Sequence, residues 1–355
     1  MLSTRAQALA AAGARFDDGR VLADLRRRVA YHSESGDPAR LPILVAYLTE
    51  EIGPTLARLG FTWTLIDNPV VGNAPFLLAS RHERDDLPTA LTYAHGDVVN
   101  GDDAAWRAGL SPWTVSVEDG CWYGRGTADN KGQHSLVLAA LDSVLHARGG
   151  LGCNFKFLME MGEELGSPGL REVCLSHREA LAADVLIASD GPRLRADQPT
   201  LFLGSRGYFN FDLVVELREA AQHSGNWGGL LANPAVILAN AIAGMVDANG
   251  RILVPGLLPP PIPDSVRRVL VDVTPGQAEG QQPTPGWGEP GLTAAERVFA
   301  WNSLEVLAFH SGTPEHPANA IPPRAWARMQ LRFVVGTDTA AVLGVLNDHL
   351  AALGL

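Results

Sequence analysis

Short apolar runs alternate with helical segments from the N-terminus to about residue 200, and this alternation limits the folds open to the chain. The segments with a helical pattern are Val21–Val29, Ile43–Leu59 and Asn130–Ala147. The apolar runs of strand length are Phe76–Ala79, Ala90–Ala94, Phe155–Met161 and Asp184–Ala188. Strands separated by helices build a sheet that is covered on both faces. We therefore predict an α/β domain over residues 1–203, with helices on both faces of its sheet.

Two of these predictions concern burial. Along Asn130–Ala147, the residues expected to share one apolar face are Leu136, Ala140, Leu141, Val144 and Leu145. The runs Phe155–Met161 and Asp184–Ala188 lack polar alternation, which is typical of strands that are buried.

The pattern changes near Gly204. The elements expected beyond it are a strand over Phe209–Leu217, a helix over Pro234–Val246, a strand over Ala325–Val335 and a closing helix over Thr339–Leu353. Residues 255–291 are so rich in proline and glycine that we predict a long loop there rather than core structure. Residues 204–355 are therefore predicted to form a smaller α+β domain.

The composition is that of a globular, acidic chain. Hydrophobic residues make up 46% of the 355 residues and charged residues 19%, which excludes disorder as the main state. The net charge of −11 argues against a nucleic-acid partner and against a polybasic membrane anchor, because both need a basic surface. No apolar run approaches the roughly 18 residues that cross a bilayer. We expect neither nucleic acid nor membrane as a partner.

The cysteines and the N-terminus favour the cytoplasm. Cys121, Cys153 and Cys174 are odd in number and lack CxxC spacing, so we expect a reducing compartment rather than a disulfide framework. The stretch Ala6–Ala14 is only weakly hydrophobic and runs into a charged segment, which favours a first helix over a signal peptide.

Acidic or histidine side chains lie just beyond four segments of the predicted sheet. His95 and Asp97 follow one apolar strand, and Asp190 follows another. Glu163 and Glu164 come after a third strand, and Asp129 precedes the long helix. Open α/β sheets bind ligands outside the carboxyl ends of their strands, so these side chains can converge there. One histidine with several carboxylates is a ligand set suited to zinc.

Each group also has a simpler explanation. A histidine after a strand is often a hydrogen-bonded loop residue, and Glu163 with Glu164 can be a solvated helix start. Asp129 can cap the helix that follows it, and Asp190 can belong to an ordinary turn. Their joint occurrence in one sheet favours the metal site.

The order of these segments resembles that of the co-catalytic di-zinc metallopeptidases, the family of carnosinase, aminoacylase, acetylornithine deacetylase and glutamate carboxypeptidase. The matching segments are His95-Gly-Asp-Val-Val, Gly124-Arg-Gly-Thr-Ala-Asp-Asn-Lys-Gly, Met161-Gly-Glu-Glu-Leu-Gly-Ser, Ala188-Ser-Asp-Gly, Gln222-His-Ser-Gly-Asn-Trp-Gly-Gly and Asn319-Ala-Ile-Pro-Pro with Arg332. The resemblance implies a zinc-peptidase-like sheet and a second domain that acts as lid and dimerisation domain.

The resemblance also implies a centre of two divalent metal ions. His95, Asp129 and Asp190 would hold one ion, and Asp129 would bridge to a second ion that Glu164 also holds. Zinc is the expected metal, and manganese and cobalt also suit such ligands.

The other implied roles concern protons and substrate. Asp97 would orient the ring of His95, and Glu163 would be the general base. His223 would reach the active site of a partner subunit in a homodimer and stabilise the oxyanion. Asn319 and Arg332 would bind the carboxylate of the substrate.

One feature departs from the family. Its members resume the α/β domain after the lid and supply a further histidine to the second metal, whereas this chain stops at Leu355. His134, His310, His316 and His349 lie on helices or in the lid, and none follows a strand. We therefore expect the C-terminal part of the catalytic domain to be absent and the second ligand set to be incomplete.

The function implied is metal-dependent hydrolysis of an amide or peptide bond in a small substrate with a carboxylate, through a metal-activated water. The substrate is a dipeptide or an N-acyl amino acid, and the presence of Asp190 and Trp227 weakly favours a dipeptide. A non-catalytic homologue that dimerises and binds at most one metal is a further alternative. A nucleotide-binding protein is disfavoured because the glycine-rich segment lacks the third glycine of a dinucleotide fingerprint.

Overall fold

The computed structural model describes residues 4–191, 199–202, 204–275, 283–313 and 316–355. The chain divides into two compact units, Met1–Pro192 and Arg193–Leu355, whereas the sequence places the boundary after residue 203. Each unit has its own sheet and its own hydrophobic core. No helix in the described ranges is long and apolar enough to cross a bilayer.

The first unit is built on a five-stranded mixed sheet with the strand order β1-β2-β6-β3-β7. Its strands are β1 (Thr62–Ile66), β2 (Phe76–Arg81), β3 (Thr89–His95), β6 (Asn154–Glu160) and β7 (Val185–Ala188). β3 runs parallel to β6 and β7, whereas β2 runs antiparallel to β1 and β6. A hairpin of β4 (Ser116–Glu118) and β5 (Cys121–Tyr123) pairs outside this sheet.

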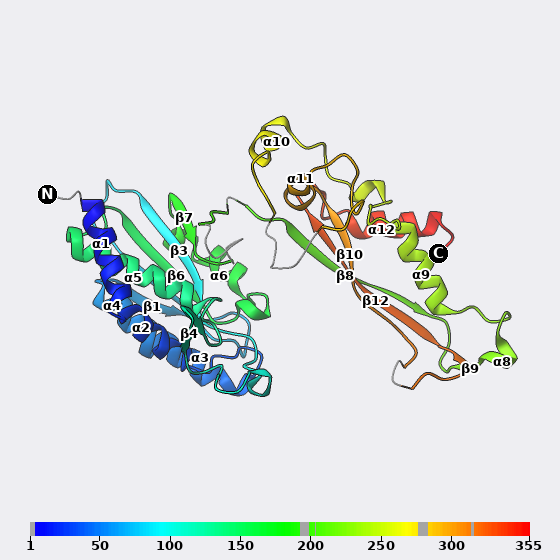
Figure 1. Ribbon diagram of the computed structural model, residues 1–355, viewed down its shortest axis with the longest axis horizontal. Coiled ribbons are helices and arrows are strands. Elements are labelled where there is room, and N and C mark those ends of the chain that lie inside the picture. The colour runs from blue at the N-terminus through cyan, green and yellow to red at the C-terminus, as the bar shows by residue number, and fades with distance from the viewer. Residues whose placement is uncertain (1–3, 192–198, 203, 276–282, 314–315) are drawn as a thin grey trace. The chain divides into compact units, whose positions relative to one another are not determined.

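Helices cover both faces of this sheet, which confirms the predicted α/β fold (Figure 1). The helices are α1 (Thr4–Asp17), α2 (Arg20–Val29), α3 (Leu41–Ala46), α4 (Gly53–Arg58), α5 (Lys131–Arg148), α6 (Leu170–Ser176) and α7 (Arg178–Leu181). Single turns are η1 (Pro38–Arg40), the π-helical η2 (Tyr47–Ile52), η3 (Asp103–Ala105) and η4 (Glu163–Leu165). On one face Leu138 of α5 packs with Phe157 and Met159 of β6, and on the other Val173 of α6 packs with Leu158.

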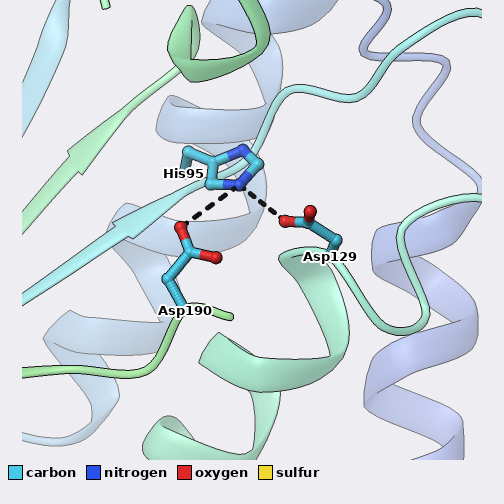
Figure 2. A group of neighbouring side chains, drawn as sticks. All are labelled: His95, Asp129 and Asp190. Carbon is cyan, nitrogen blue, oxygen red and sulfur yellow. Dashed lines mark hydrogen bonds and ion pairs between the residues drawn. The ribbon is translucent and has the colours of Figure 1, made fainter. Parts of the chain in front are cut away.

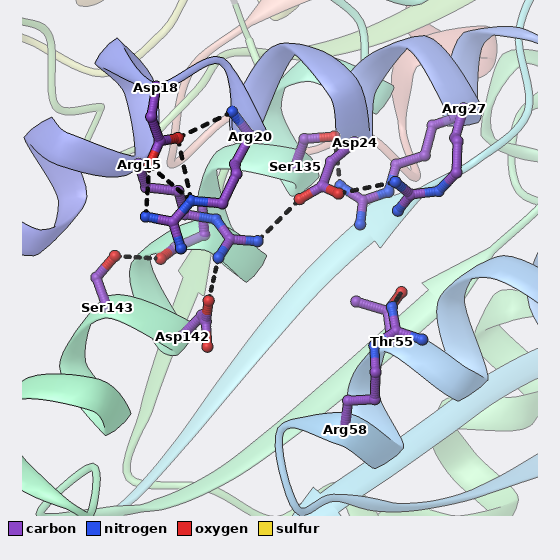
Figure 3. Close-up of polar contacts among 12 residues, drawn as sticks. Arg15, Asp18, Arg20, Asp24, Arg27, Thr55, Arg58, Ser135, Asp142 and Ser143 are labelled. Atoms are coloured by element: carbon purple, nitrogen blue, oxygen red, sulfur yellow. Dashed lines mark hydrogen bonds and ion pairs between the residues drawn. The ribbon is translucent and has the colours of Figure 1, made fainter.

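Ion pairs on Arg15 tie the first helices to α5 (Figure 3). Arg15 of α1 donates to Asp24 of α2 at 2.9 Å and also to Asp142 of α5. Arg27 of α2 lies 3.0 Å from the same Asp24. These contacts dock α1 and α2 on the helix that leads out of the Asp129 loop.

The predicted apolar face of α5 is partly wrong. Leu136 is 54% exposed and Ala140 is also exposed. The first turns of α5 instead bury His134 and Ser135, because Tyr47 of η2 and Arg28 of α2 hydrogen-bond to them at 2.7 Å each. Polar contacts with other helices, rather than apolar periodicity, decide which face of this helix is buried.

The prediction that β7 is a buried strand is also wrong. Leu186 is 61% exposed and Ile187 is 55% exposed. Within the described part of the chain β7 pairs only with β3, so it forms an edge of the sheet.

The second unit contains a three-stranded antiparallel sheet with the order β10-β12-β8. Its strands are β8 (Gly207–Glu216), β10 (Ser303–Ser311) and β12 (Arg324–Phe333), and β9 (Gln222–His223) pairs separately with β11 (Ala320–Ile321). Its helices are α8 (Ser224–Trp227), α9 (Pro234–Met245), η5 (Pro255–Leu257), α10 (Asp264–Leu270), α11 (Ala294–Phe299) and α12 (Val342–Ala352). Leu238 of α9 and Leu346 of α12 pack on Ala327 and Met329 of β12, so these helices cover one face of the sheet (Figure 1).

The second unit contains more regular structure than the sequence predicts. The proline-rich stretch includes α10, and its Leu257 and Ile262 are only 0% and 7% exposed, so the prediction of a pure loop is wrong. The strand β10 and the helix α11 are absent from the sequence-based prediction. Residues 276–282 of the same stretch lie outside the described residues.

Candidate metal centre

His95 ends β3 and is fully buried against the carboxylate of Asp97. Nδ1 of His95 lies 3.2 Å from Oδ1 of Asp97. The same carboxylate accepts the backbone N–H groups of Glu163 and Glu164, each at 3.2 Å. Asp97 therefore orients the imidazole and also holds the turn η4, which carries both glutamates. A carboxylate behind a histidine fixes the ring so that the other nitrogen faces the site.

Nε2 of His95 faces three carboxylates from three separate segments. Oδ1 of Asp129 lies 2.9 Å away, Oδ2 of Asp190 lies 3.8 Å away and Oε2 of Glu163 lies 3.9 Å away. One ligand atom each from His95, Asp129 and Asp190 fall within 4.8 Å of one another (Figure 2). The fold thus brings together three of the four predicted metal ligands.

Residues at the start of α5 hold the loop that carries Asp190. Nδ2 of Asn130 donates to the carbonyl oxygen of Ser189 at 2.8 Å, and Nε2 of Gln133 donates to that of Gly191 at 2.9 Å. The N-cap residue of α5 is Asn130, and no side chain caps the helix there. The carboxylate of Asp129 points to His95 instead, which rules out the simpler explanation of a helix cap.

Glu163 and Glu164 are the two carboxylates of η4. Burial raises the pKa of Glu163, and the charges of Asp190 and Glu164 add to the effect. Burial and the charge of Asp129 likewise raise the pKa of Glu164. Glu164 lies outside the three-residue group around His95. A carboxyl group with a raised pKa suits proton transfer near neutral pH.

The donor set fits a divalent cation. Neutral His95 can donate through Nε2 to only one of the carboxylates there, so the others face one another without compensation. Burial opposes a charge on His95, but hydrogen bonds to Asp129 and Asp97 raise its pKa to about 10. The cluster therefore attracts positive charge strongly, and imidazole with carboxylate oxygens suits zinc, manganese or cobalt.

Three buried polar residues near the site were missed as functional candidates. Nζ of Lys131 donates to the carbonyl oxygen of Tyr31 at 2.7 Å and lies 5.2 Å from the ring centre of Tyr47. The hydroxyl of Tyr47 lies 2.7 Å from Nε2 of His134. Burial lowers the pKa of Lys131 to about 7 and also lowers that of His134. Lys131 and His134 follow the Asp129 loop directly, which is a usable signal, whereas Tyr47 gives none.

The other predicted residues lie in the second unit. His223 and Asn319 are neighbours there, because β9 pairs with β11 and the carbonyl oxygen of Asn319 accepts the N–H of Ser224 at 2.9 Å. The exposed ring of His223 accepts the N–H of Gly225 through Nδ1 at 3.1 Å, so a neutral ring carries its proton on Nε2. Arg332 of β12 donates to Oε1 of Gln330 at 2.8 Å.

Comparison with known proteins gives one family match. The model of peptidase family M20/M25/M40 matches residues 91–327, which include His95, Asp129, Asp190 and the two glutamates of η4.

Two curated relatives are dipeptidases by name. The chain is 30% identical over 313 residues to a cysteinylglycine-S-conjugate dipeptidase of Corynebacterium striatum, covering 85% of this chain and 64% of that protein. It is 32% identical over 306 residues to the Beta-Ala-His dipeptidase of Rattus norvegicus, covering 81% of this chain and 60% of that protein. The chain thus spans less than two thirds of the length of either relative.

A solved structure shares the fold over most of the chain. The M20 family metallo-carboxypeptidase of Sulfolobus solfataricus matches with a TM-score of 0.78 and 26% identity, covering 94% of this chain and 76% of that one.

Proposed function

Because the chain belongs to peptidase family M20/M25/M40, we propose that it is a metal-dependent hydrolase that cleaves the peptide bond of a dipeptide with a free carboxylate. The observation that carries the proposal is the group of His95, Asp129 and Asp190 with Glu163 beside it. The names of the two dipeptidase relatives favour a dipeptide over an N-acyl amino acid.

His95, Asp129 and Asp190 would hold one divalent ion, and Asp129 with Glu164 would hold a second. Zinc is the proposed metal. Such ions, when bound, lower the pKa of water and polarise an amide carbonyl. Within the described residues, no further group of three ligands includes Glu164. The first site therefore has the stronger support.

The protein's own groups would move the proton and hold the substrate. Glu163 would take a proton from the attacking water and pass it to the leaving amine, which its raised pKa supports. His223 would donate from Nε2 to the developing oxyanion in a partner subunit. Asn319 and Arg332 would bind the carboxylate, for which the planar guanidinium suits two-point binding.

A substrate panel with controlled metal content tests the proposal. We expect dipeptides to be hydrolysed faster than matched N-acyl amino acids, with activity lost after chelation and restored by zinc. Elemental analysis of the same zinc-dialysed sample should give at least one ion per chain, and a value close to two would mean that a further residue completes the second ligand set. Faster hydrolysis of the N-acyl substrates would favour a deacylase. No hydrolysis with one ion or fewer per chain would favour the non-catalytic homologue.

Replacing Asp97 with asparagine should weaken metal binding by roughly 10- to 100-fold, the usual effect of losing a carboxylate behind a ligating histidine. Asparagine keeps the shape of Asp97 but cannot accept all three of its hydrogen bonds. Competition with a chromogenic chelator measures the affinity. The matched control is Asp85→Asn, a fully exposed carboxylate. Equal metal affinity in the two variants would exclude the positioning role of Asp97.

We also propose a cytoplasmic homodimer that assembles through the second unit. Trp227 is 44% exposed and Leu230 is 76% exposed beside His223, which supports an interaction surface there. Cys121, Cys153 and Cys174 carry free thiols, as proteins of reducing compartments do. Sedimentation velocity at micromolar concentrations tests the dimer.

A further inference from the structure

The face of the β10-β12-β8 sheet opposite α9 and α12 carries a row of polar cross-strand pairs, and the last of these contains an arginine without an acidic partner. Arg328 of β12 lies opposite Asp212 of β8 and binds its carboxylate through two contacts. The next pair on this face joins Gln330 to Asn210 at 2.9 Å. In the third pair, Arg332 lies opposite Tyr208, whose ring centre is 5.3 Å from the guanidinium carbon. The charge of Arg332 therefore has an aromatic partner but no acidic one across the ladder.

A second guanidinium lies beside Arg332. Arg206 directly precedes β8 and stands two residues before Tyr208 in the sequence. Its Nη1 lies 3.5 Å from Oγ of Ser303 on β10, and Ser303 pairs with Arg332 across β10 and β12. Because β12 lies between β8 and β10, the side chain of Arg206 crosses β12 next to Arg332.

The two arginines are not neutralised within the described part of the chain. Neither guanidinium forms an ion pair there, in contrast to Arg328 with Asp212. Burial and the adjacent charge of Arg332 lower the pKa of Arg206, and Glu305 on β10 opposes this effect. Glu305, together with Glu289 in the wall of the adjoining cavity, is thus an acidic group that an anionic ligand of Arg206 would meet.

Arg206 also lines a cavity of about 470 Å³ in the second unit. The charged and aromatic side chains in its wall are Arg206, Arg251, Trp287, Glu289, Arg297, Trp301 and Glu305. Arg251 is paired with Asp247, and Arg297 donates to the carbonyl oxygens of Glu289 and Trp287. Nε of Arg251 is nevertheless buried without a hydrogen-bond partner in the described part of the chain, so Arg251 also keeps a donor. Arg206 differs from the other two arginines of this wall because it lies next to Arg332.

We propose that Arg206 and Arg332 form a two-point site for a dicarboxylate, so that the substrate carries an acidic C-terminal residue. Arg332 binds the α-carboxylate, and Arg206 binds the side-chain carboxylate at the mouth of the cavity. The assignment of the α-carboxylate rests on the proposed function, whereas the pairing of the two guanidiniums does not.

Calorimetry on the metal-free full chain tests the site independently of catalysis. The probes are N-acetyl-L-glutamate and N-acetyl-L-glutamine, which match in size and differ by one carboxylate. We expect the glutamate derivative to bind at least about tenfold tighter than the glutamine derivative. Its second carboxylate adds charge-assisted hydrogen bonds to Arg206, and such bonds increase affinity by about this factor. Arg206→Gln should abolish the preference, and Arg332→Gln should weaken both ligands. Arg328→Gln is the matched control, because it removes the same charge from the same face, and should leave the preference intact.

Two further variants keep the test decisive if Arg206→Gln folds poorly. Glu305→Gln should tighten binding of the glutamate derivative, because it removes the opposing charge, and Arg206→Lys should retain part of the preference. Equal affinity for the two probes, no measurable binding of either, or equal weakening of both by Arg206→Gln would each overturn the proposal. Hydrolysis of neutral dipeptides without a preference for acidic ones would refute only this site. A preference in binding without hydrolysis would refute only the proposed function.

Discussion

Glu163→Gln should lower kcat for dipeptide hydrolysis by about 10²- to 10⁴-fold while the protein still folds and binds metal. Glutamine fills the same space as Glu163 but cannot take a proton from water at neutral pH. Glu163 is not one of the three residues grouped as ligands, and its carboxylate lies 3.9 Å from Nε2 of His95. The loss should therefore appear in catalysis rather than in metal content.

The measurement compares kcat, metal content and thermal stability of Glu163→Gln with those of Glu172→Gln. Glu172 is an exposed glutamate on α6, so the control makes the same chemical change away from the site. Retained activity in Glu163→Gln would remove Glu163 from the role of base. Loss of metal together with activity would make Glu163 a ligand instead.

The candidate site was predictable because its residues follow a topological rule. His95 is the last residue of β3, and Asp190 and Glu163 lie just beyond β7 and β6, which are the neighbours of β3 in the sheet. Apolar runs in the sequence locate such strands, and parallel strands bring their carboxyl ends to one edge. Asp129 was predicted from its occurrence together with the other three signals, because a residue before a helix, taken alone, is more simply explained as a cap.

The rest depends on tertiary contacts that periodicity does not record. The sequence contains an apolar run over β7, but it does not tell whether a second strand pairs with the other edge of β7. The helix α10 begins directly after Pro263. Proline is compatible with the start of a helix, but the many prolines of this stretch led to the prediction of a loop. The role of Asp97 in holding η4 arises from backbone N–H groups that are far away in sequence.

A buried arginine of α2 contacts both η2 and the site helix α5. Arg28 is only 1% exposed, and its Nε lies 3.1 Å from Oε1 of Glu51, whose side chain is 8% exposed. Nη1 of Arg28 donates to Oγ of Ser135 on α5 at 2.7 Å. The neighbouring Arg27, labelled in Figure 3, lies 3.2 Å from the same Glu51 oxygen. Glu51 is thus the counter-charge of two arginines, one of them fully enclosed.

Glu51→Gln should destabilise the protein by about 3–5 kcal/mol, because it leaves the charge of Arg28 buried without compensation. The matched control is Glu50→Gln, the exposed neighbour on the same helical turn, which should change stability by no more than about 0.5 kcal/mol. Urea denaturation followed by circular dichroism, with chelator present, gives both free energies of unfolding without a contribution from bound metal. The double variant Arg28→Leu/Glu51→Leu should recover much of the loss, because an apolar pair of similar volume has no charge to desolvate. Equal stability of the two single variants would mean that the hydrogen bond to Ser135, rather than the ion pair, holds Arg28 in place.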